Sequence, residues 1–300
     1  MRTAKSWQPI VIGFDASTEA VHAAEFGCRL AAAAGTTCHV VHAAPDEWPA
    51  IVAASLPGAM AEYRQALVDR ARRELALRME GVDMPLSHDE IDVRLGPPAR
   101  VLGEAVRGVG AELVVLGGKH HPALQRWLGG STALNAVRSL DVPVLVTRGA
   151  PTLPTRILVA ADISAAAGPT FAAADRLARL CGAQVRAVSV LRPIELFGST
   201  ADSQPPEYYA LWEGMLQRDV WPLIRSAGSE TVVRHGAADE TIGQEVVAWG
   251  ADLLVVGSHG KGWVDRLLIG SVTEQLLNRL PTSLLVVPVS AALEAASRRS

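Results

Sequence analysis

Glycines and a hydroxyl residue cluster in a short part of the chain, residues 255–277, where two helical runs follow a strand-like run. Gly257 and Gly260 lie just after the apolar strand-like run, and Gly270 and Ser271 precede the second helical run. A glycine lets backbone N–H groups approach an anion without a Cβ in the way, and a helix N-terminus adds unpaired donors and partial positive charge. These residue types at this spacing predict a phosphate or nucleotide site.

Two other phosphate-binding motifs fit this segment less well. Lys261 is followed by Gly262, whereas a Walker loop needs serine or threonine after its lysine, and no G-x-G-x-x-G follows the first predicted strand. We therefore predict neither a P-loop NTPase nor a dinucleotide dehydrogenase. A glycine-rich turn that binds nothing is the plain alternative. Several glycines in one strand-to-helix connection, with Ser271 at the expected helix start, favour binding over that alternative.

An aspartate ends the strand-like run ILVAAD at Asp162. A carboxylate at this place can accept hydrogen bonds from an adenine edge or a ribose, while its charge makes it a poor ligand for phosphate. The alternative is that Asp162 or Ser164 caps the following helix, a common use of these residues after a strand. Local sequence leaves both uses open.

Composition excludes several classes of protein. The 300 residues carry a net charge of −3 and 49% hydrophobic residues, which predicts a soluble globular protein that does not bind nucleic acid. The apolar runs are much shorter than the roughly 18 residues of a membrane span. Cys28, Cys38 and Cys181 form no CxxC pair, and the N-terminus lacks a long apolar run, so a reduced, cytoplasmic location is expected.

The chain repeats itself after about 140 residues, which is the size of a domain rather than of a solenoid unit. We expect two duplicated domains, residues 1–149 and 155–290, joined by the linker GAPTLP. The recurring residues are Asp15 with Asp162, Gly35 with Gly182, Gly117 with Gly257, and Gly130-Ser131 with Gly270-Ser271.

Each half alternates helical stretches with continuous apolar strands, which is typical of an α/β fold whose parallel sheet is covered on both faces. Strands are predicted near 9–14, 37–42, 89–95, 112–117 and 143–147, and near 156–161, 184–190, 230–235, 252–257 and 283–288. In the second half, helices are predicted near 164–181, 206–226, 238–249 and 270–280. The last strand of each half is expected to pair between the halves or between chains, because an open edge leaves backbone groups unpaired.

The second half also carries a recognisable motif: a strand ending in aspartate, then G-x-x-G, nine intervening residues and G-S-V. This pattern resembles the universal stress protein family, and the resemblance covers both halves. It implies two tandem open five-stranded parallel sheets flanked by helices, a Rossmann-like fold that binds adenine nucleotides in some members. The implied binding residues are Asp162, Val188, Gly257, Gly260, Gly270, Ser271 and Val272.

The resemblance assigns a role to each part of this set. The aspartate would meet the adenine or ribose, the valine would contact the adenine through its backbone, and the two earlier glycines would line the phosphate path. The Gly-Ser-Val run would present N–H and hydroxyl donors to the phosphates. The implied ligand is ATP, and a metal, if present, would be the Mg²⁺ that arrives with it.

The first half departs from this motif. Its equivalent set, a second and degenerate site, is Asp15, Val41, Gly117, Gly130 and Ser131. His120 takes the place of Gly260 and Pro122 that of Gly262, so a Cβ crowds the phosphate path and one N–H donor is lost. Two alternatives stay open: Lys119, His120 and His121 supply cationic contacts instead, or they form an exposed polar turn. We expect the second half to be the better ATP site.

The leading functional hypothesis is a cytoplasmic tandem stress protein that senses or stores adenine nucleotide in the stress response. No constellation of nucleophile, base and oxyanion donors stands out, so no catalytic residue is assigned. A slow ATPase or nucleotidyl-transfer enzyme, with Asp162 or Asp15 positioning a metal, is one alternative. A stress scaffold that binds no nucleotide is the other. In each case the halves form an internal pseudo-dimer, and a homodimer is expected.

Overall fold

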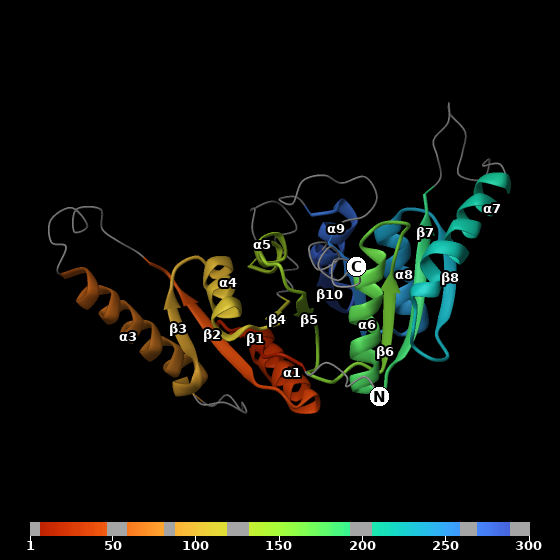
Figure 1. Ribbon diagram of the computed structural model, residues 1–300. Helices are drawn as coiled ribbons and strands as arrows, with labels where there is room; N and C mark the ends of the chain where they lie inside the picture. The colour runs from red at the N-terminus through yellow and green to blue at the C-terminus, as the bar shows by residue number, and fades with distance from the viewer. Residues whose placement is uncertain are drawn as a thin grey trace. The chain divides into compact units, whose positions relative to one another are not determined.

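The computed structural model describes residues 7–46, 59–80, 88–118, 132–192, 206–258 and 269–288. Chain contacts divide the protein into two compact units, which we call the first unit (residues 1–140 and 149–151) and the second unit (141–148 and 152–300). In each unit, strands alternate with helices along the chain (Figure 1). Among the described residues, none of the helices has the length and apolarity that a membrane crossing requires.

The first unit holds a sheet in the order β3-β2-β1-β4, in which all neighbours are parallel. Its strands are β1 (Ile10–Gly13), β2 (Cys38–Ala44), β3 (Asp92–Leu95) and β4 (Leu113–Gly117). Its helices are α1 (Thr18–Ala34), α3 (Ala59–Met79), α4 (Pro98–Val109) and α5 (Thr132–Ser139), with a 3-10 turn η1 (His88–Glu90). Both faces are covered, because Ile12 lies under Gly27 of α1 while the next residue, Gly13, lies beside Leu102 of α4.

The second unit holds a sheet in the order β5-β10-β9-β6-β7-β8. Its parallel strands are β6 (Arg156–Ala160), β7 (Gln184–Leu191), β8 (Glu230–His235), β9 (Leu253–Gly257) and β10 (Ser283–Val287). Its helices are α6 (Ala167–Cys181), α7 (Pro206–Met215), α8 (Ala238–Trp249) and α9 (Ser271–Arg279). These five strands form the open parallel sheet flanked by helices that the sequence predicts.

Strand β5 (Val144–Thr147) is the last strand of the first sequence repeat, yet it groups with the second unit. It pairs antiparallel with β10, so that Leu145 lies opposite Leu285. The N–H of Arg148 then donates to the Ser283 hydroxyl at 3.0 Å. The predicted pairing of the two terminal strands is confirmed, and both strands lie in the sheet of the second unit.

The strands are buried on both faces, as their continuous apolar sequences indicate. Ile157, Leu158 and Val159 of β6 are each 0% exposed, although successive side chains point to opposite faces. Helices α4 and α8 end at Gly110 and Gly250, whose φ angles of 64° and 68° suit glycine. These caps turn the chain straight into the central strands β4 and β9, which explains why this segment recurs in both halves.

The prediction of a continuous helix near 206–226 is wrong. Helix α7 ends at Met215 and is followed by a π-helical turn η3 (Leu216–Val220) and a 3-10 turn η4 (Trp221–Leu223). Pro222 lies inside this stretch, and proline has no N–H to continue an α-helical ladder. The break leaves Arg225 and Ser226 beside α6, where Asp175 accepts hydrogen bonds from both main-chain N–H groups at 3.0 Å.

Candidate functional site

The second unit has a point where the order of its strands reverses. The chain runs from β6 outward to β7 and β8, and then returns to β9 and β10 on the other side of β6. Strands β6 and β9 are neighbours, with Ala160 opposite Val256. Open α/β sheets bind ligands in the crevice beyond the carboxyl ends of strands at such a point. Asp162, two residues after β6, and Gly257, at the end of β9, both lie at this edge.

Helix α9 begins at the same edge and is tied to the end of β9. Its N-cap residue is Gly270, in an extended conformation with φ −61° and ψ 139°. The Gly270 N–H donates to the Ser258 carbonyl, and the Thr273 hydroxyl donates to the Gly257 carbonyl, both at 2.9 Å. These two bonds hold the positive end of the α9 dipole over the carboxyl end of the sheet.

The same bonds decide which donors the start of α9 can offer. Since the Gly270 N–H is engaged with Ser258, it is not a ready donor to a ligand. The first bond within the helix runs from the Glu274 N–H to the Gly270 carbonyl at 2.9 Å, so the N–H groups of Ser271 and Val272 precede the helical ladder. The exposed Ser271 adds a hydroxyl at the same place. Sequence reasoning missed Thr273, whose hydroxyl anchors this helix start.

Asp162 is half-buried in the loop between β6 and α6, and its carbonyl accepts from the Ser164 N–H at 2.9 Å. The N-cap of α6 is Ala166, which makes no side-chain cap. Neither Asp162 nor Ser164 is therefore the N-cap residue of this helix. The Ser164 hydroxyl is buried without a hydrogen-bond partner among the residues that the structure describes.

Val188 lies inside the sheet, in the middle of β7. It is opposite Ala160 of β6 and Val232 of β8, and its side chain is fully buried. Its carbonyl accepts from the Ala161 N–H at 3.0 Å. Val190, on the same face of β7 but two residues nearer its carboxyl end, is only half-buried and was missed by sequence reasoning.

The equivalent edge of the first unit is organised differently around Asp15. An Asp15 carboxylate oxygen accepts from the N–H of Ser17 at 3.1 Å and from its hydroxyl at 2.5 Å. The Ser17 hydroxyl oxygen in turn accepts from the Ala20 N–H at 3.3 Å and caps α1. In this half, the aspartate supports the helix cap.

Two further residues of the first set have structural contacts. The Val41 carbonyl accepts from the Phe14 N–H at 2.9 Å, as Val188 accepts from Ala161 in the second unit. A Cβ on Gly117 would lie 2.5 Å from the backbone of Glu19, so this glycine permits the close approach of α1 to β4. Outside the described residues lie Gly130, Ser131, Gly260 and Gly262, together with Lys119, His120, His121 and Pro122.

Larger side chains flank the aspartate in the first unit than in the second. The buried Phe14 precedes Asp15, and the ring of His42 bonds the Phe14 carbonyl through Nδ1 at 2.8 Å. The repeat places Ala161 and Ser189 at these two positions in the second unit. Ser189 is only 1% exposed, and its hydroxyl lacks a hydrogen-bond partner within the described part of the chain.

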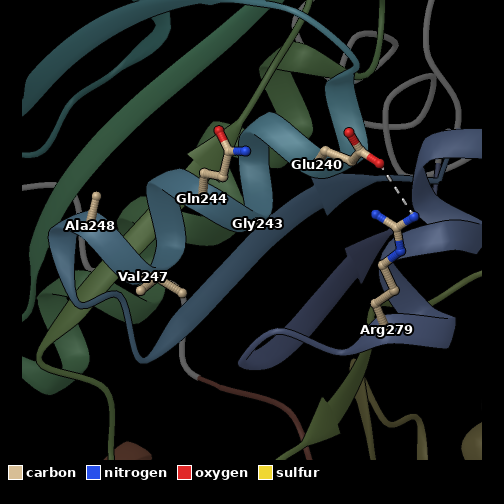
Figure 2. Close-up of a pocket in the computed structure, with 6 residues that line it drawn as sticks. All are labelled: Glu240, Gly243, Gln244, Val247, Ala248 and Arg279. Atoms are coloured by element: carbon tan, nitrogen blue, oxygen red, sulfur yellow. Dashed lines mark ion pairs between the residues drawn. The ribbon is translucent and has the colours of Figure 1, made fainter.

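A shallow pocket lies elsewhere in the second unit, on the outer surface of α8 (Figure 2). Arg279, near the end of α9, reaches across it to Glu240 at 3.8 Å. Val247 on this surface is 78% exposed. The lining residues are Glu240, Gly243, Gln244, Val247, Ala248 and Arg279, and none belongs to the predicted nucleotide set. Within the described ranges, no three potential metal ligands gather.

Comparisons with known proteins agree with this architecture. A universal stress protein of Mycobacterium tuberculosis (strain ATCC 25618 / H37Rv) is 28% identical over 287 residues, which cover 90% of this chain and 93% of that protein. A solved universal stress protein from Archaeoglobus fulgidus matches with a TM-score of 0.63 at 16% identity, over 95% of this chain and all of its own. A solved putative universal stress protein from Pseudomonas aeruginosa matches with a TM-score of 0.60 at 17% identity, over 97% of this chain and 98% of its own.

The two solved structures show the likeness of fold over nearly the whole chain. The sequence model of the universal stress protein family matches this chain twice, over residues 6–148 and 154–288. Those two matches correspond to the two repeats that the sequence shows. The chain is therefore a tandem member of the universal stress protein family.

Proposed function

We propose that the protein binds an adenine nucleotide, with ATP as the ligand, at the strand-order reversal of the second unit. The nucleotide-bound form acts in the stress response as a sensor or store of nucleotide rather than as a rapid enzyme. The observation that carries this proposal is the start of α9, which two hydrogen bonds tie to the end of β9. The positive end of a helix is a natural place for a phosphate.

The donors at this helix start suit a phosphate chain. The N–H groups of Ser271 and Val272 precede the helical ladder, and the Ser271 hydroxyl is exposed beside them. A hydrogen bond to a charged group contributes about 1.5–3 kcal/mol. Three such bonds account for a substantial part of the roughly 8 kcal/mol of a micromolar complex, and stacking and ribose contacts supply the remainder.

Asp162 supplies the opposite end of the proposed site. It follows β6, the neighbour of β9, and it is not the N-cap of α6. Its carboxylate is suited to a ribose hydroxyl or an adenine amino group, because both donate hydrogen bonds. A ligand that lies with its phosphates over α9 and its nucleoside over β6 spans the reversal point, as ligands of open α/β sheets do.

The second unit is the better site because of the side chains beside its aspartate. In the first unit, the positions beside Asp15 carry the larger Phe14 and His42. In the second unit, the corresponding positions are Ala161 and Ser189. Smaller side chains leave more room for a base or a ribose. We accordingly propose one nucleotide per chain, in a protein that works in the cytoplasm as a homodimer.

Identification of the bound molecule tests this proposal. The protein is purified gently at low salt, and small molecules are released by acid and identified by mass spectrometry. We expect an adenine nucleotide in wild-type protein and in Asp15→Ala, and its loss in Asp162→Ala. Purified wild-type protein that carries no nucleotide and shows no thermal shift with added ATP contradicts the proposal and favours the scaffold alternative.

A further inference from the structure

Two cysteines of the first unit lie side by side. Cys28 is on α1, Cys38 is the first residue of β2, and their sulfur atoms are 2.9 Å apart. Helix α1 ends at Ala34, and Gly35 with φ 63° turns the chain back so that β2 begins three residues later. Both side chains are half-buried. The reversal at Gly35 therefore brings together two thiols that are ten positions apart in sequence.

The repeat shows that this pair is particular to the first unit. The positions equivalent to Cys28 and Cys38 in the second unit are Asp175 and Val185. Asp175 accepts hydrogen bonds from the turn after η4, and Val185 is a buried strand residue. The fold of the repeat is thus built with other residues at these two places, so the packing of α1 on β2 does not itself require two thiols.

The thiols also differ in acidity. The hydrogen bond from Cys28 lowers the pKa of Cys38 to about 7, and the same bond, followed by burial, raises the pKa of Cys28. The carboxylate of Glu90 raises both pKa values. Cys38 is consequently the thiol that ionises first, and a thiolate is the nucleophilic form of cysteine. Cys28 remains protonated beside it.

We propose that Cys28 and Cys38 are a redox-modification site that closes to a reversible disulfide when the protein meets hydrogen peroxide. The Cys38 thiolate attacks one oxygen of hydrogen peroxide, the O–O bond breaks, and a sulfenic acid forms. The released hydroxide takes up the proton that the Cys38 thiol lost when it ionised, and becomes water. The Cys28 sulfur then attacks the sulfur of Cys38, its own proton leaves with the hydroxyl group as water, and the S–S bond forms. Two thiols are oxidised and one peroxide is reduced to two water molecules.

The geometry requires little movement for this step. A disulfide bond is roughly 2.05 Å long, so the sulfur atoms need to approach by about 0.9 Å from 2.9 Å, which small side-chain rotations provide. The closed ring ties α1 to β2, which already pack within one unit. Transient, sensing disulfides are the usual kind in a reducing compartment. The proposal is independent of nucleotide binding, which we assign to the second unit.

Cys181 offers an internal control. It lies at the end of α6 in the second unit, and burial raises its pKa to about 11. Cys181 is half-buried like the paired cysteines, and a thiol with a raised pKa reacts slowly with peroxide. Arg29, which lies between the paired cysteines in sequence, makes detection simple. Trypsin cuts after it, so Cys28 and Cys38 fall in the separate peptides 6–29 and 30–64 unless a disulfide joins them.

The test treats the folded full chain with increasing hydrogen peroxide, blocks remaining thiols with N-ethylmaleimide, and analyses tryptic peptides by mass spectrometry. We expect the joined peptides 6–29 and 30–64, lighter than their sum by two hydrogen atoms, and their separation by dithiothreitol. Cys181 should carry N-ethylmaleimide throughout. Failure of the joined peptides to form while Cys181 is already oxidised overturns the proposal.

Two variants assign the roles of the sulfurs. Cys28→Ser should accumulate a sulfenic acid at Cys38, detected with a dimedone probe, whereas Cys38→Ser should leave Cys28 unlabelled by that probe and unoxidised at the same peroxide dose. Thermal unfolding of both variants checks that they fold. A Cys38→Ser variant that forms sulfenic acid at Cys28 as fast as Cys28→Ser does at Cys38 contradicts the assignment.

Discussion

The two equivalent aspartates should differ in what they do. We expect Asp15→Ala mainly to lower the stability of the protein and Asp162→Ala mainly to weaken its binding of ATP. Asp15→Ala removes a carboxylate oxygen that accepts two hydrogen bonds from Ser17, which itself caps α1. Hydrogen bonds to charged groups contribute about 1.5–3 kcal/mol each, and partial exposure reduces that figure, so we expect a loss of about 2 kcal/mol in the free energy of unfolding. For a unit of this size, that loss lowers the melting temperature by roughly 4–8 °C.

Asp162→Ala should leave the cap of α6 intact, because this helix is capped at Ala166 without a side-chain bond. The same change should weaken ATP binding by about tenfold or more, which corresponds to the loss of about 1.4 kcal/mol of binding free energy. Calorimetric melting and isothermal titration with ATP measure the two effects on one pair of variants. The reverse pattern, in which Asp15→Ala abolishes ATP binding and Asp162→Ala leaves it unchanged, refutes the reasoning.

Three further changes test single contacts. Gly117→Ala places a Cβ 2.5 Å from the backbone of α1 and should cost about 1–3 kcal/mol in urea unfolding, and an unchanged midpoint contradicts this packing. Asp175→Ala removes the acceptor of three hydrogen bonds from the turn after η4 and should cost about 3 kcal/mol, so a loss below about 1 kcal/mol contradicts its anchoring role. Iodoacetamide should alkylate Cys38 with a midpoint near pH 7, because the thiolate forms above its lowered pKa. Cys28→Ala removes the hydrogen bond to Cys38 and should move the midpoint to higher pH, so equal midpoints in the two proteins contradict the thiol pair.

The layered sheet could be predicted from the sequence because its strands carry the evidence locally. Residues 157–159 are apolar throughout and are buried on both faces, which is the property that separates a covered parallel sheet from a half-exposed one. The recurrence of Gly110 and Gly250 marks the same helix end in both halves. By contrast, the helix predicted near 206–226 ends early and gives way to π-helical and 3-10 turns around Pro222, which has no N–H to continue an α-helical ladder.

The candidate site was only partly predictable, because hydrogen bonds formed across the fold decide what each residue is free to do. The run Gly270-Ser271 predicts donors, yet the Gly270 N–H turns back to Ser258, a residue of another element. Asp15 and Asp162 look alike in sequence, and each is followed two residues later by a serine. The Ser17 hydroxyl bonds to the Asp15 carboxylate and caps α1, whereas the Ser164 hydroxyl has no hydrogen-bond partner among the described residues.

The cysteine pair shows the same limit. A spacing of ten residues between Cys28 and Cys38 matches no metal or redox motif, so the sequence indicates three separate reduced thiols. The contact arises because α1 and β2 are consecutive elements joined by a tight turn at Gly35. Whether two side chains meet across such a turn depends on the rotation of the helix, which a composition or a spacing does not specify.

The starts of α9 and α8 provide a matched pair of variants that test whether ATP binds at the start of α9. Gly270 is extended, with φ −61° and ψ 139°, so valine fits its backbone and its side chain would lie where phosphates are expected. Ala237 is the N-cap of α8, is also extended with φ −71° and ψ 123°, and follows the outer strand β8, away from the reversal between β6 and β9. Valine at Ala237 therefore tests an equal change at a helix start that is not part of the proposed site.

Isothermal titration of ATP into the wild-type chain, Gly270→Val and Ala237→Val is the most direct measurement of nucleotide binding at the second unit. We predict one ATP per wild-type chain, the same affinity within about twofold for Ala237→Val, and at least about tenfold weaker binding for Gly270→Val, a difference of about 1.4 kcal/mol or more. Wild-type protein that binds no ATP, or Gly270→Val protein that binds it as tightly as Ala237→Val, contradicts the claim.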